Sequence, residues 1–203
     1  MTHPQQTERH FPIHSLDSAP MPSKAVMQWY QEQFGMVPNL IQIMSEAPAL
    51  LLSYWQTQVN LLEHSTLSKQ EINIVQTIVS HENRCQYCVS GHMAFGKDPV
   101  FNNTDAQMAA IRNETDFEDA KLNVLRDFTR KVMKNQGRMA SSVLQTFLAA
   151  GYTRAQALDV VACIAVKAMS NYMNQMVLTP LDIAFESFAD DLPYREQRPS
   201  IPA

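Results

Sequence analysis

Two cysteines and a histidine lie close together near the middle of the chain. Cys85 and Cys88 form a C-x-x-C pair, and His92 follows Cys88 by four positions. If a helix begins near Cys85, the three side chains lie on one face, because residues three and four apart are neighbours on a helix surface. Two thiols and an imidazole at this spacing indicate a redox site.

This cluster could carry out dithiol chemistry. The free N–H groups and the macrodipole at a helix N-terminus favour thiolate over thiol, and a thiolate is a nucleophile. Once one sulfur is oxidised, the other can form a disulfide with it, and a reductant resets the pair. His92 can take or supply a proton near neutral pH. The helix dipole favours Cys85 as the more thiolate-like sulfur.

Metal and haem sites fit the same cysteines less well. A structural zinc ion would need a further ligand from His64 or His81, because the chain has no second C-x-x-C. Covalent haem attachment requires a histidine directly after the second cysteine, where this chain has Val89. An iron–sulfur cluster lacks ligands unless subunits share one. We therefore predict a site without a metal or an organic cofactor.

Composition narrows the class of protein. The chain has 203 residues, 45% of them hydrophobic, which is enough for a substantial core. A net charge of −4 with scattered lysines and arginines predicts no nucleic-acid partner. We see no signal-peptide pattern and no apolar run of roughly 18 residues, so we predict no membrane partner. Three cysteines are too few for a secreted disulfide framework, and we expect a soluble, cytoplasmic protein.

The elements that must position the site are helices. No segment alternates with period two over a strand's length, so the predicted fold class is all-α. Ser68 and Glu71 form a capping-box pattern for a helix to about His81, and a break at Asn83 precedes the cysteine helix, which we expect to end near Gly96. Further helices are expected over 23–34 with Ser23 as N-cap, 39–46, 48–64, 104–113, 117–135, 140–150 and 154–178 with Thr153 as N-cap.

Domain organisation follows from these elements. The segment 1–22 is predicted to be an extended N-terminal arm, because four prolines interrupt any helix there. Residues 23–189 are expected to form a single all-helical domain, with a motif-bearing half over about 23–100 and a second helical half over about 101–189. Residues 190–203 are expected to be a C-terminal tail.

The sequence around the motif resembles a known family. Residues 79–92, Val-Ser-His-Glu-Asn-Arg-Cys-Gln-Tyr-Cys-Val-Ser-Gly-His, are similar to the signature of the alkylhydroperoxidase D-like (AhpD-like) proteins of the carboxymuconolactone decarboxylase superfamily. The resemblance is to an uncharacterised, peroxidase-related branch and covers roughly Phe34 to Ala189. Other similar segments are 34–40, 48–54, 67–68, 170–174 and 179–182.

The resemblance implies both a fold and an activity. The fold would be AhpD-like and helical, with the C-x-x-C at the start of a core helix, in a dimer, trimer or hexamer. The activity would be that of a thiol peroxidase, in which Cys88 attacks hydrogen peroxide or an organic hydroperoxide, Cys85 resolves the sulfenic acid and His92 relays protons. A dithiol protein or a small thiol would supply electrons. Because the dipole argument favours Cys85, the attacking cysteine stays open here.

Two positions depart from the family's pattern. Its relay glutamate falls at Asn73 of this chain, and a histidine before the second cysteine is replaced by Tyr87. An amide cannot accept the relayed proton, and a phenol is a poor base near neutral pH. Among nearby groups His81 is the better candidate for a substitute base, although a histidine at such a position is more often a surface residue. We predict weaker peroxidase activity than a full relay gives, or a different substrate.

The last predicted helix carries polar residues in an apolar setting. Asn171 and Asn174 need hydrogen-bond partners if they are buried, and could line a pocket opposite the cysteine helix or lie in a subunit interface. Lys167, one turn earlier, is either a satisfied buried charge or an interface cation. Cys163, among small apolar residues, is expected to be a buried packing thiol.

Two other functions stay open from the sequence. An enzyme of the carboxymuconolactone decarboxylase type would protonate a ring intermediate with a histidine, and would leave the C-x-x-C without a role. A non-catalytic redox sensor or metal-binding protein would use the same thiols without turning over a substrate.

Overall fold

Helices build the whole fold in a computed structural model that describes residues 11–189 and residue 192. No strand occurs among these residues, so the all-α prediction is confirmed. In chain order the helices are α1 Met21–Phe34, α2 Asn39–Met44, α3 Pro48–His64, α4 Lys69–Glu82, α5 Gln86–Gly96, α6 Asp105–Arg112, α7 Ala120–Asn135, α8 Ser141–Ala149, α9 Arg154–Val177 and the 3-10 helix η2 Ile183–Phe188.

Capping residues set where several helices begin. Ser68, Thr104 and Thr153 each accept a hydrogen bond from the backbone N–H three residues on, and that residue's side chain accepts one in return. The capping box predicted at Ser68 is therefore confirmed, as is the start predicted at Thr153. Helix α7 begins later than predicted, at Ala120, because the Asp119 side chain caps it.

The first helix begins before the residue predicted to cap it. Pro20 occupies the N-cap position of α1, and proline in the first turn suits a helix start. Ser23 is already inside the helix, where its hydroxyl donates to the Ser45 carbonyl at 2.8 Å. Helix α1 thus includes the last two residues of the predicted arm. Residues 1–10 of that arm, and the predicted tail apart from Leu192, lie outside the described residues.

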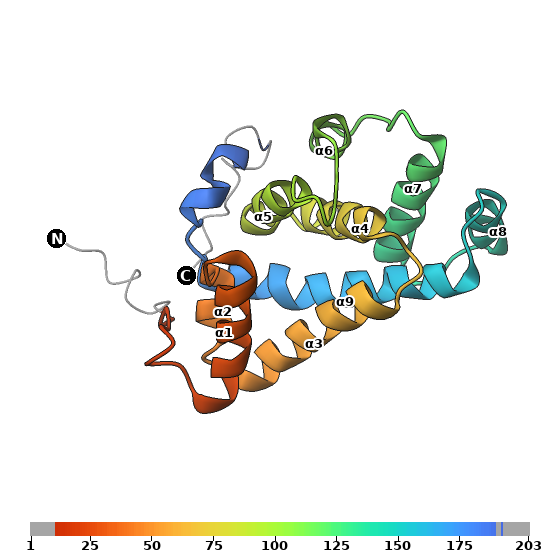
Figure 1. Ribbon diagram of the computed structural model, residues 1–203. Coiled ribbons are helices and arrows are strands. Elements are labelled where there is room, and N and C mark those ends of the chain that lie inside the picture. Colours follow the sequence, from red (N-terminus) through yellow and green to blue (C-terminus); the bar gives the residue numbers. More distant parts are fainter. Residues whose placement is uncertain (1–10, 190–191, 193–203) are drawn as a thin grey trace, which may run out of the picture.

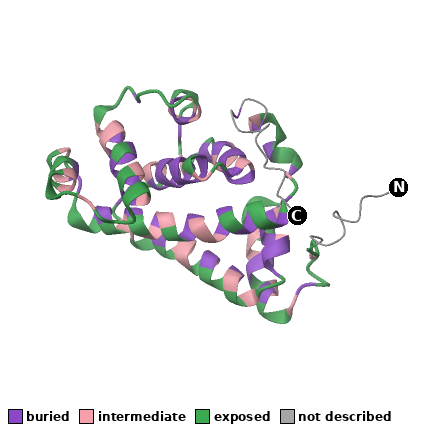
Figure 2. Ribbon diagram, turned by 180° about the vertical axis from the view of Figure 1, so that it is seen from behind, coloured by how far each residue is buried: buried purple, intermediate pink, exposed green. Residues whose placement is uncertain are grey.

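Helix α4 lies at the centre of the fold. It packs against α5, α7 and α9, while α3 lies along α9 (Figure 1). Every residue of α4 from Ile72 to His81 is buried, and the buried residues of α4 and α5 form the purple middle of Figure 2. Polar side chains on α4 therefore need partners inside the protein.

The short helix η2 closes the C-terminal side of α5. It packs against α5, and the Phe185 ring meets the rings of Tyr87 and Phe95 edge-on, with 5.7 and 5.5 Å between the ring centroids. The segment before it is tied down as well, because the Asp182 carboxylate accepts the Asn39 backbone N–H at 3.0 Å. The sequence analysis did not predict this helix.

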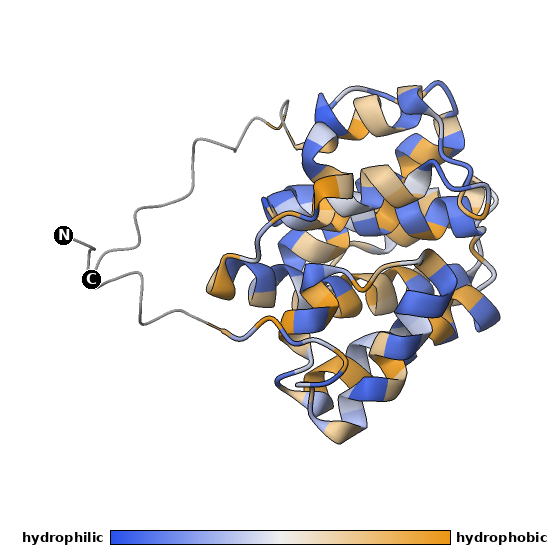
Figure 3. Cartoon of the chain, turned by 60° about the vertical axis from the view of Figure 1, so that its left-hand side comes forward, coloured by the Kyte–Doolittle hydropathy of each residue, from blue (hydrophilic) through white to orange (hydrophobic). Residues whose placement is uncertain are grey.

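Each helix carries both hydrophobic and hydrophilic residues, as expected of amphipathic helices packed around a shared core (Figure 3). In the described part of the chain, none of the helices combines the length and the apolar character needed to cross a membrane.

Candidate active site

The two cysteines lie at the start of α5. Cys85 is the N-cap residue and Cys88 lies in the first turn, so the helix begins where the motif predicted. A left-handed conformation at Arg84 (φ 53°) links α4 to α5, and the Cys85 N–H donates to the Ser80 carbonyl at 2.9 Å. The cysteine side chains are 1% and 3% exposed. The pair is thus buried and fixed against α4.

The two thiols differ in acidity, in the order opposite to the dipole prediction. Burial would raise the pKa of Cys88, but a hydrogen bond from Cys85 and the positive charge of Lys167 outweigh it. With further donors from Asn174 and Asn171, the pKa of Cys88 falls to about 6. Burial raises the pKa of Cys85 well above its usual value, and its interactions with Cys88 raise it further. Cys88 is therefore the thiolate.

Helix α9 supplies hydrogen-bond donors that stabilise the thiolate form of Cys88. The Asn174 Nδ2 donates to the Cys88 sulfur at 3.1 Å, and the Asn174 Oδ1 accepts from the Thr179 hydroxyl at 2.6 Å. The second bond fixes the orientation of the amide, so that its N–H points at sulfur. Both cysteines lie at the same helix end, and it is this tertiary contact that distinguishes them.

Lys167 also enters from α9, and it is 1% exposed. Burial would lower its pKa, but the negative charge of Cys88 raises it, with help from Tyr54, Cys85 and a hydrogen bond to Cys88. Lysine and thiolate therefore stabilise each other's charged form in a buried ion pair.

His92 is held by a short chain of amides. Its Nδ1 lies 2.8 Å from the Asn73 Oδ1. The Asn73 Nδ2 donates to the Asn103 Oδ1 at 2.8 Å and to the His92 carbonyl at 3.2 Å. Asn103 in turn donates to the Gln70 carbonyl at 3.3 Å. Since the Asn73 Nδ2 faces two oxygens, its Oδ1 must be the acceptor, and the His92 Nδ1 carries the proton.

The other ring nitrogen of His92, Nε2, consequently carries no proton. Burial lowers the pKa of His92 well below its usual value, and the charge of Lys167 lowers it further, so the imidazole is neutral. A neutral imidazole has one N–H, which is already engaged with Asn73. Asn73 therefore orients the ring and fixes its tautomer, a role its amide can fill although it cannot relay a proton.

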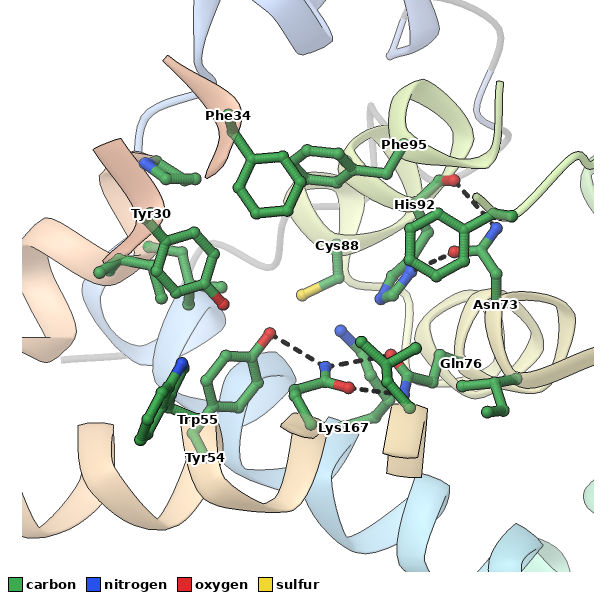
Figure 4. Close-up of a pocket in the computed structure, with 18 of the residues that line it drawn as sticks. Tyr30, Phe34, Tyr54, Trp55, Asn73, Gln76, Cys88, His92, Phe95 and Lys167 are labelled. Atoms are coloured by element: carbon green, nitrogen blue, oxygen red, sulfur yellow. Dashed lines mark hydrogen bonds between the residues drawn. The ribbon is translucent and has the colours of Figure 1, made fainter. Parts of the chain in front are cut away.

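A cavity of about 210 Å³ opens beside these groups. Cys88, His92 and Lys167 point toward one another at its wall (Figure 4). The Gln58 and Gln76 amides satisfy each other there, at 2.8 and 3.1 Å. The rest of the lining is mainly aromatic and apolar, and includes Trp29, Tyr30, Phe34, Trp55, Phe95 and Phe185.

Tyr87 serves as an anchor. Its hydroxyl donates to the Asp182 carboxylate and accepts from the Leu40 N–H at 3.0 Å. Burial raises the pKa of Tyr87 well above its usual value, and the Asp182 charge raises it further. The phenol therefore stays protonated, and it ties η2 and α2 to α5.

Two other predicted residues lie off the cavity wall. His81 is buried with its Nδ1 3.9 Å from a Glu114 carboxylate oxygen, and burial lowers its pKa although Glu114 raises it. It is not among the residues that line the cavity, so its imidazole does not face that space directly. Asn171 accepts from the Asn83 Nδ2 at 2.9 Å and donates to the Ser80 hydroxyl at 3.3 Å, which braces α9 against α4.

Lys167 is the site residue to which the sequence analysis assigned no role. A usable signal was present: positions 167, 170, 171 and 174 are three and four apart, so a polar Lys167 shares a helix face with Asn171 and Asn174. Cys163 is fully buried, and burial raises its pKa to about 12, which agrees with the predicted packing thiol.

Metal-ligating residues are scattered. Within the ranges that the structure describes, no three His, Cys, Asp or Glu side chains are grouped so that they could hold a metal ion. The His64 side chain, considered as a zinc ligand, is 73% exposed and lies beside Glu63.

Comparison with known proteins concerns the fold. No family model and no curated protein matches the chain. Among solved structures, an alkylhydroperoxidase AhpD core, an uncharacterized peroxidase-related protein from Ralstonia eutropha JMP134, superposes with a TM-score of 0.74 at 23% identity, covering 86% of this chain and 93% of that one. An uncharacterized peroxidase-related protein from Silicibacter sp. TM1040 superposes with a TM-score of 0.71 at 20% identity, covering 86% of this chain and 91% of that one.

The debrominase Bmp8 is also similar, with a TM-score of 0.70 at 18% identity over 89% of this chain and 95% of that one. At identities this low the likeness lies in the path of the backbone. The chain has the helical fold of the alkylhydroperoxidase AhpD core.

Proposed function

We propose that this protein is a thiol peroxidase that reduces organic hydroperoxides. The observation that carries the proposal is the place of the Cys88 sulfur, which lies on a cavity wall, in the first turn of the helix that Cys85 caps, and accepts a hydrogen bond from Asn174. A nucleophilic sulfur with a second thiol in contact is the arrangement that a two-electron dithiol cycle requires.

The cycle has three steps. The Cys88 thiolate attacks the terminal peroxide oxygen, so an S–O bond forms, the O–O bond breaks, and an alkoxide leaves and takes up a proton. Cys85 then attacks the Cys88 sulfenic acid, which forms the disulfide and releases water. An external dithiol reduces the disulfide and is itself oxidised.

The cavity favours an organic hydroperoxide over hydrogen peroxide. Its volume of about 210 Å³ exceeds many times the roughly 30 Å³ share of one water molecule in the liquid. Its lining is largely aromatic, so an apolar organic group would gain free energy by leaving water there. A small polar peroxide would leave most of that surface unused.

Steady-state kinetics tests the proposal. With dithiothreitol as reductant we expect turnover of cumene hydroperoxide, with a higher kcat/KM than for hydrogen peroxide. Cys88→Ser should abolish turnover, Cys85→Ser should stop at a stoichiometric sulfenic acid, and the control Cys163→Ser should behave like the wild type. Wild-type thiols that resist oxidation would overturn the proposal, and oxidation of both without turnover would indicate a redox sensor.

A second candidate is reductive dehalogenation of an aromatic compound. One structural neighbour is named a debrominase, and the cavity places the Cys88 thiolate among aromatic side chains suited to a planar ring. Cys88 would take the halogen from carbon, a proton would replace it on the ring, and Cys85 would displace halide as the disulfide forms. Bromide release from a brominated phenol, dependent on both cysteines, would distinguish this activity.

A further inference from the structure

The buried Lys167 has a chemical setting that the cycle above leaves unused. Its side chain reaches the cavity wall beside Cys88 and His92 (Figure 4). Among the described residues no aspartate or glutamate forms an ion pair with it, and its counter-charge is the Cys88 thiolate.

The neighbours of Lys167 are neutral or belong to the reaction. Titratable groups that face it come from three parts of the fold, namely Tyr54 of α3, Cys85, Cys88 and His92 at α5, and Cys163 of α9 itself. Helix α4 presents amides to the cavity rather than charges. The cavity lining also includes one carboxylate, that of Glu63, whose side chain is 63% exposed and forms no ion pair with Lys167.

Peroxide cleavage requires a proton donor at this wall. The alkoxide that leaves is a strong base, and it is expelled slowly unless an acid protonates it. His92 cannot be that acid, because its single proton is on Nδ1 and is held by Asn73. The Tyr87 proton is committed to Asp182. The phenols of Tyr30 and Tyr54 also line the cavity, but the ammonium of Lys167 is the positively charged donor on this wall, beside Cys88.

Building on the proposed function, we propose that Lys167 is the general acid of this site and protonates the leaving alkoxide as Cys88 attacks the peroxide. Lys167 is then a catalytic residue, because it lies beside the reacting sulfur on the cavity wall and faces the oxygen that departs.

The cycle balances with Lys167 as donor. Attack converts thiolate, hydroperoxide and ammonium into sulfenic acid, alcohol and a neutral amine. In the second step the proton lost by the Cys85 thiol and the hydroxide lost by the sulfenic acid combine to form water. Reduction by an external dithiol returns two protonated cysteines, and Cys88 then passes its proton to the Lys167 amine. The resting ion pair is restored.

The attack by Cys88 itself increases the acidity of the Lys167 ammonium. In the resting state the Cys88 charge holds the proton on Lys167 against the cost of burial. As the S–O bond forms, sulfur loses that charge and only burial remains, which favours the neutral amine. The ammonium therefore becomes a stronger acid as the alkoxide appears.

The test compares two oxidants that differ in their need for a proton. Alkyl hydroperoxides release an alkoxide, whereas a peracid releases a carboxylate that stays ionised near neutral pH. Lys167→Arg keeps a positive charge beside Cys88 but cannot give up its proton. We expect its rate constant for a single oxidation of Cys88 to fall about 10²- to 10⁴-fold with cumene hydroperoxide and to change little with peracetic acid.

Two measurements guard against a merely structural effect. Thiolate absorbance against pH reports whether Cys88 keeps its acidity in Lys167→Arg, and circular dichroism reports the fold. In Lys167→Met, the rate constants per thiolate should show the same selective loss with cumene hydroperoxide. Equal losses with both oxidants in both variants, or no loss with the alkyl hydroperoxide, would overturn the inference. Failure of the proposed function looks different: wild-type Cys88 would react with the peracid and not with any alkyl hydroperoxide.

Discussion

At the scale of single residues, the two sulfurs of one motif are assigned opposite states by their neighbours. Cys88 is stabilised as a thiolate by Cys85, Lys167 and amides of α9, whereas burial and the neighbouring Cys88 keep Cys85 protonated. Under the proposed function this difference makes Cys88 the nucleophile and Cys85 the resolving thiol, which are the roles that the family resemblance implies.

The first prediction concerns the pH dependence of Cys88. Its pKa of about 6 lies below the usual thiol value, so the thiolate fraction and the rate of alkylation should rise as pH increases through about 6 and level off above it. Asn174→Leu removes a donor to the thiolate and should move the midpoint up by about one unit. In the wild type the Gln175 amide donates a hydrogen bond to the Asn83 carbonyl and not to Cys88. The control Gln175→Leu should therefore leave the midpoint unchanged. Iodoacetamide labelling read by mass spectrometry gives the profile.

The second prediction reverses an expectation that the sequence suggests. Restoring the family's carboxylate with Asn73→Glu should not raise hydroperoxide turnover. The new carboxylate would face the Asn103 Oδ1 and the His92 carbonyl, two oxygens that now accept hydrogen bonds. Unsatisfied buried groups cost about 1–3 kcal/mol each, so urea unfolding should also show a loss. Higher turnover at unchanged stability would contradict this account of Asn73.

The reactive residues were only partly predictable from sequence. Cys85, Cys88 and His92 could be selected because their types and spacing are local properties of the chain. Which cysteine ionises could not be predicted, because the deciding contacts with Lys167 and Asn174 arise from the packing of a distant helix.

At the scale of elements, Gly96 is a point where the backbone of helix α5 leaves no room for a side chain beside the amide chain. A Cβ added there would lie 2.9 Å from the Asn73 Nδ2 and 3.2 Å from the Asn103 Oδ1. Both atoms belong to the network that orients His92, so neither can move without cost. Glycine at this position lets the end of α5 lie against that network.

The third prediction compares two glycines of α5. Gly96→Ala should destabilise the fold by about 1–3 kcal/mol, because the added methyl group displaces the amides. Gly91→Ala is the matched control: its Cβ would meet the Phe185 ring at 3.4 Å, an ordinary contact, and alanine favours the helix by up to about 1 kcal/mol. Denaturant midpoints check both. Equal effects at the two positions would contradict the close approach at Gly96.

Most helix boundaries could be predicted, and the exceptions have local causes. The boxes at Ser68 and Thr153 use side chains and backbone within one turn, so the sequence contains the whole signal. The start of α1 was misplaced because Pro20 and the proline after Met21 open the helix, and Ser23 bonds elsewhere. Helix η2 was missed because tertiary contacts through Tyr87 hold it in place.

At the scale of the whole molecule, α9 has an inner and an outer face. Its inner face supplies the groups around Cys88. On the outer face lies a row of large apolar side chains that remain exposed, namely Leu158 at 71%, Val161 at 49%, Tyr172 at 64% and Met176 at 58%. Exposed apolar surface of this extent along one helix is typical of an interaction site.

The fourth prediction is that a second copy of this chain covers that row, as the implied homo-oligomer requires. Tyr172→Arg should lower the molar mass measured by light scattering, because a charge at an apolar interface is costly to bury. The control is Gln28→Arg, at an exposed position of α1, and it should leave the molar mass unchanged. A wild-type protein that runs as a monomer would contradict the prediction.

The hydrogen bond from Asn174 to Cys88 joins residues 86 positions apart in the chain. A contact so distant in sequence requires the whole stretch between its two residues to be present and brought together. While the C-terminal half is still being synthesised, or whenever α9 undocks, both cysteines of the motif are therefore ordinary, mostly protonated thiols. The protein acquires its reactive sulfur only once α9 is docked, so a chain that lacks α9 is spared the oxidation to which the finished one is exposed.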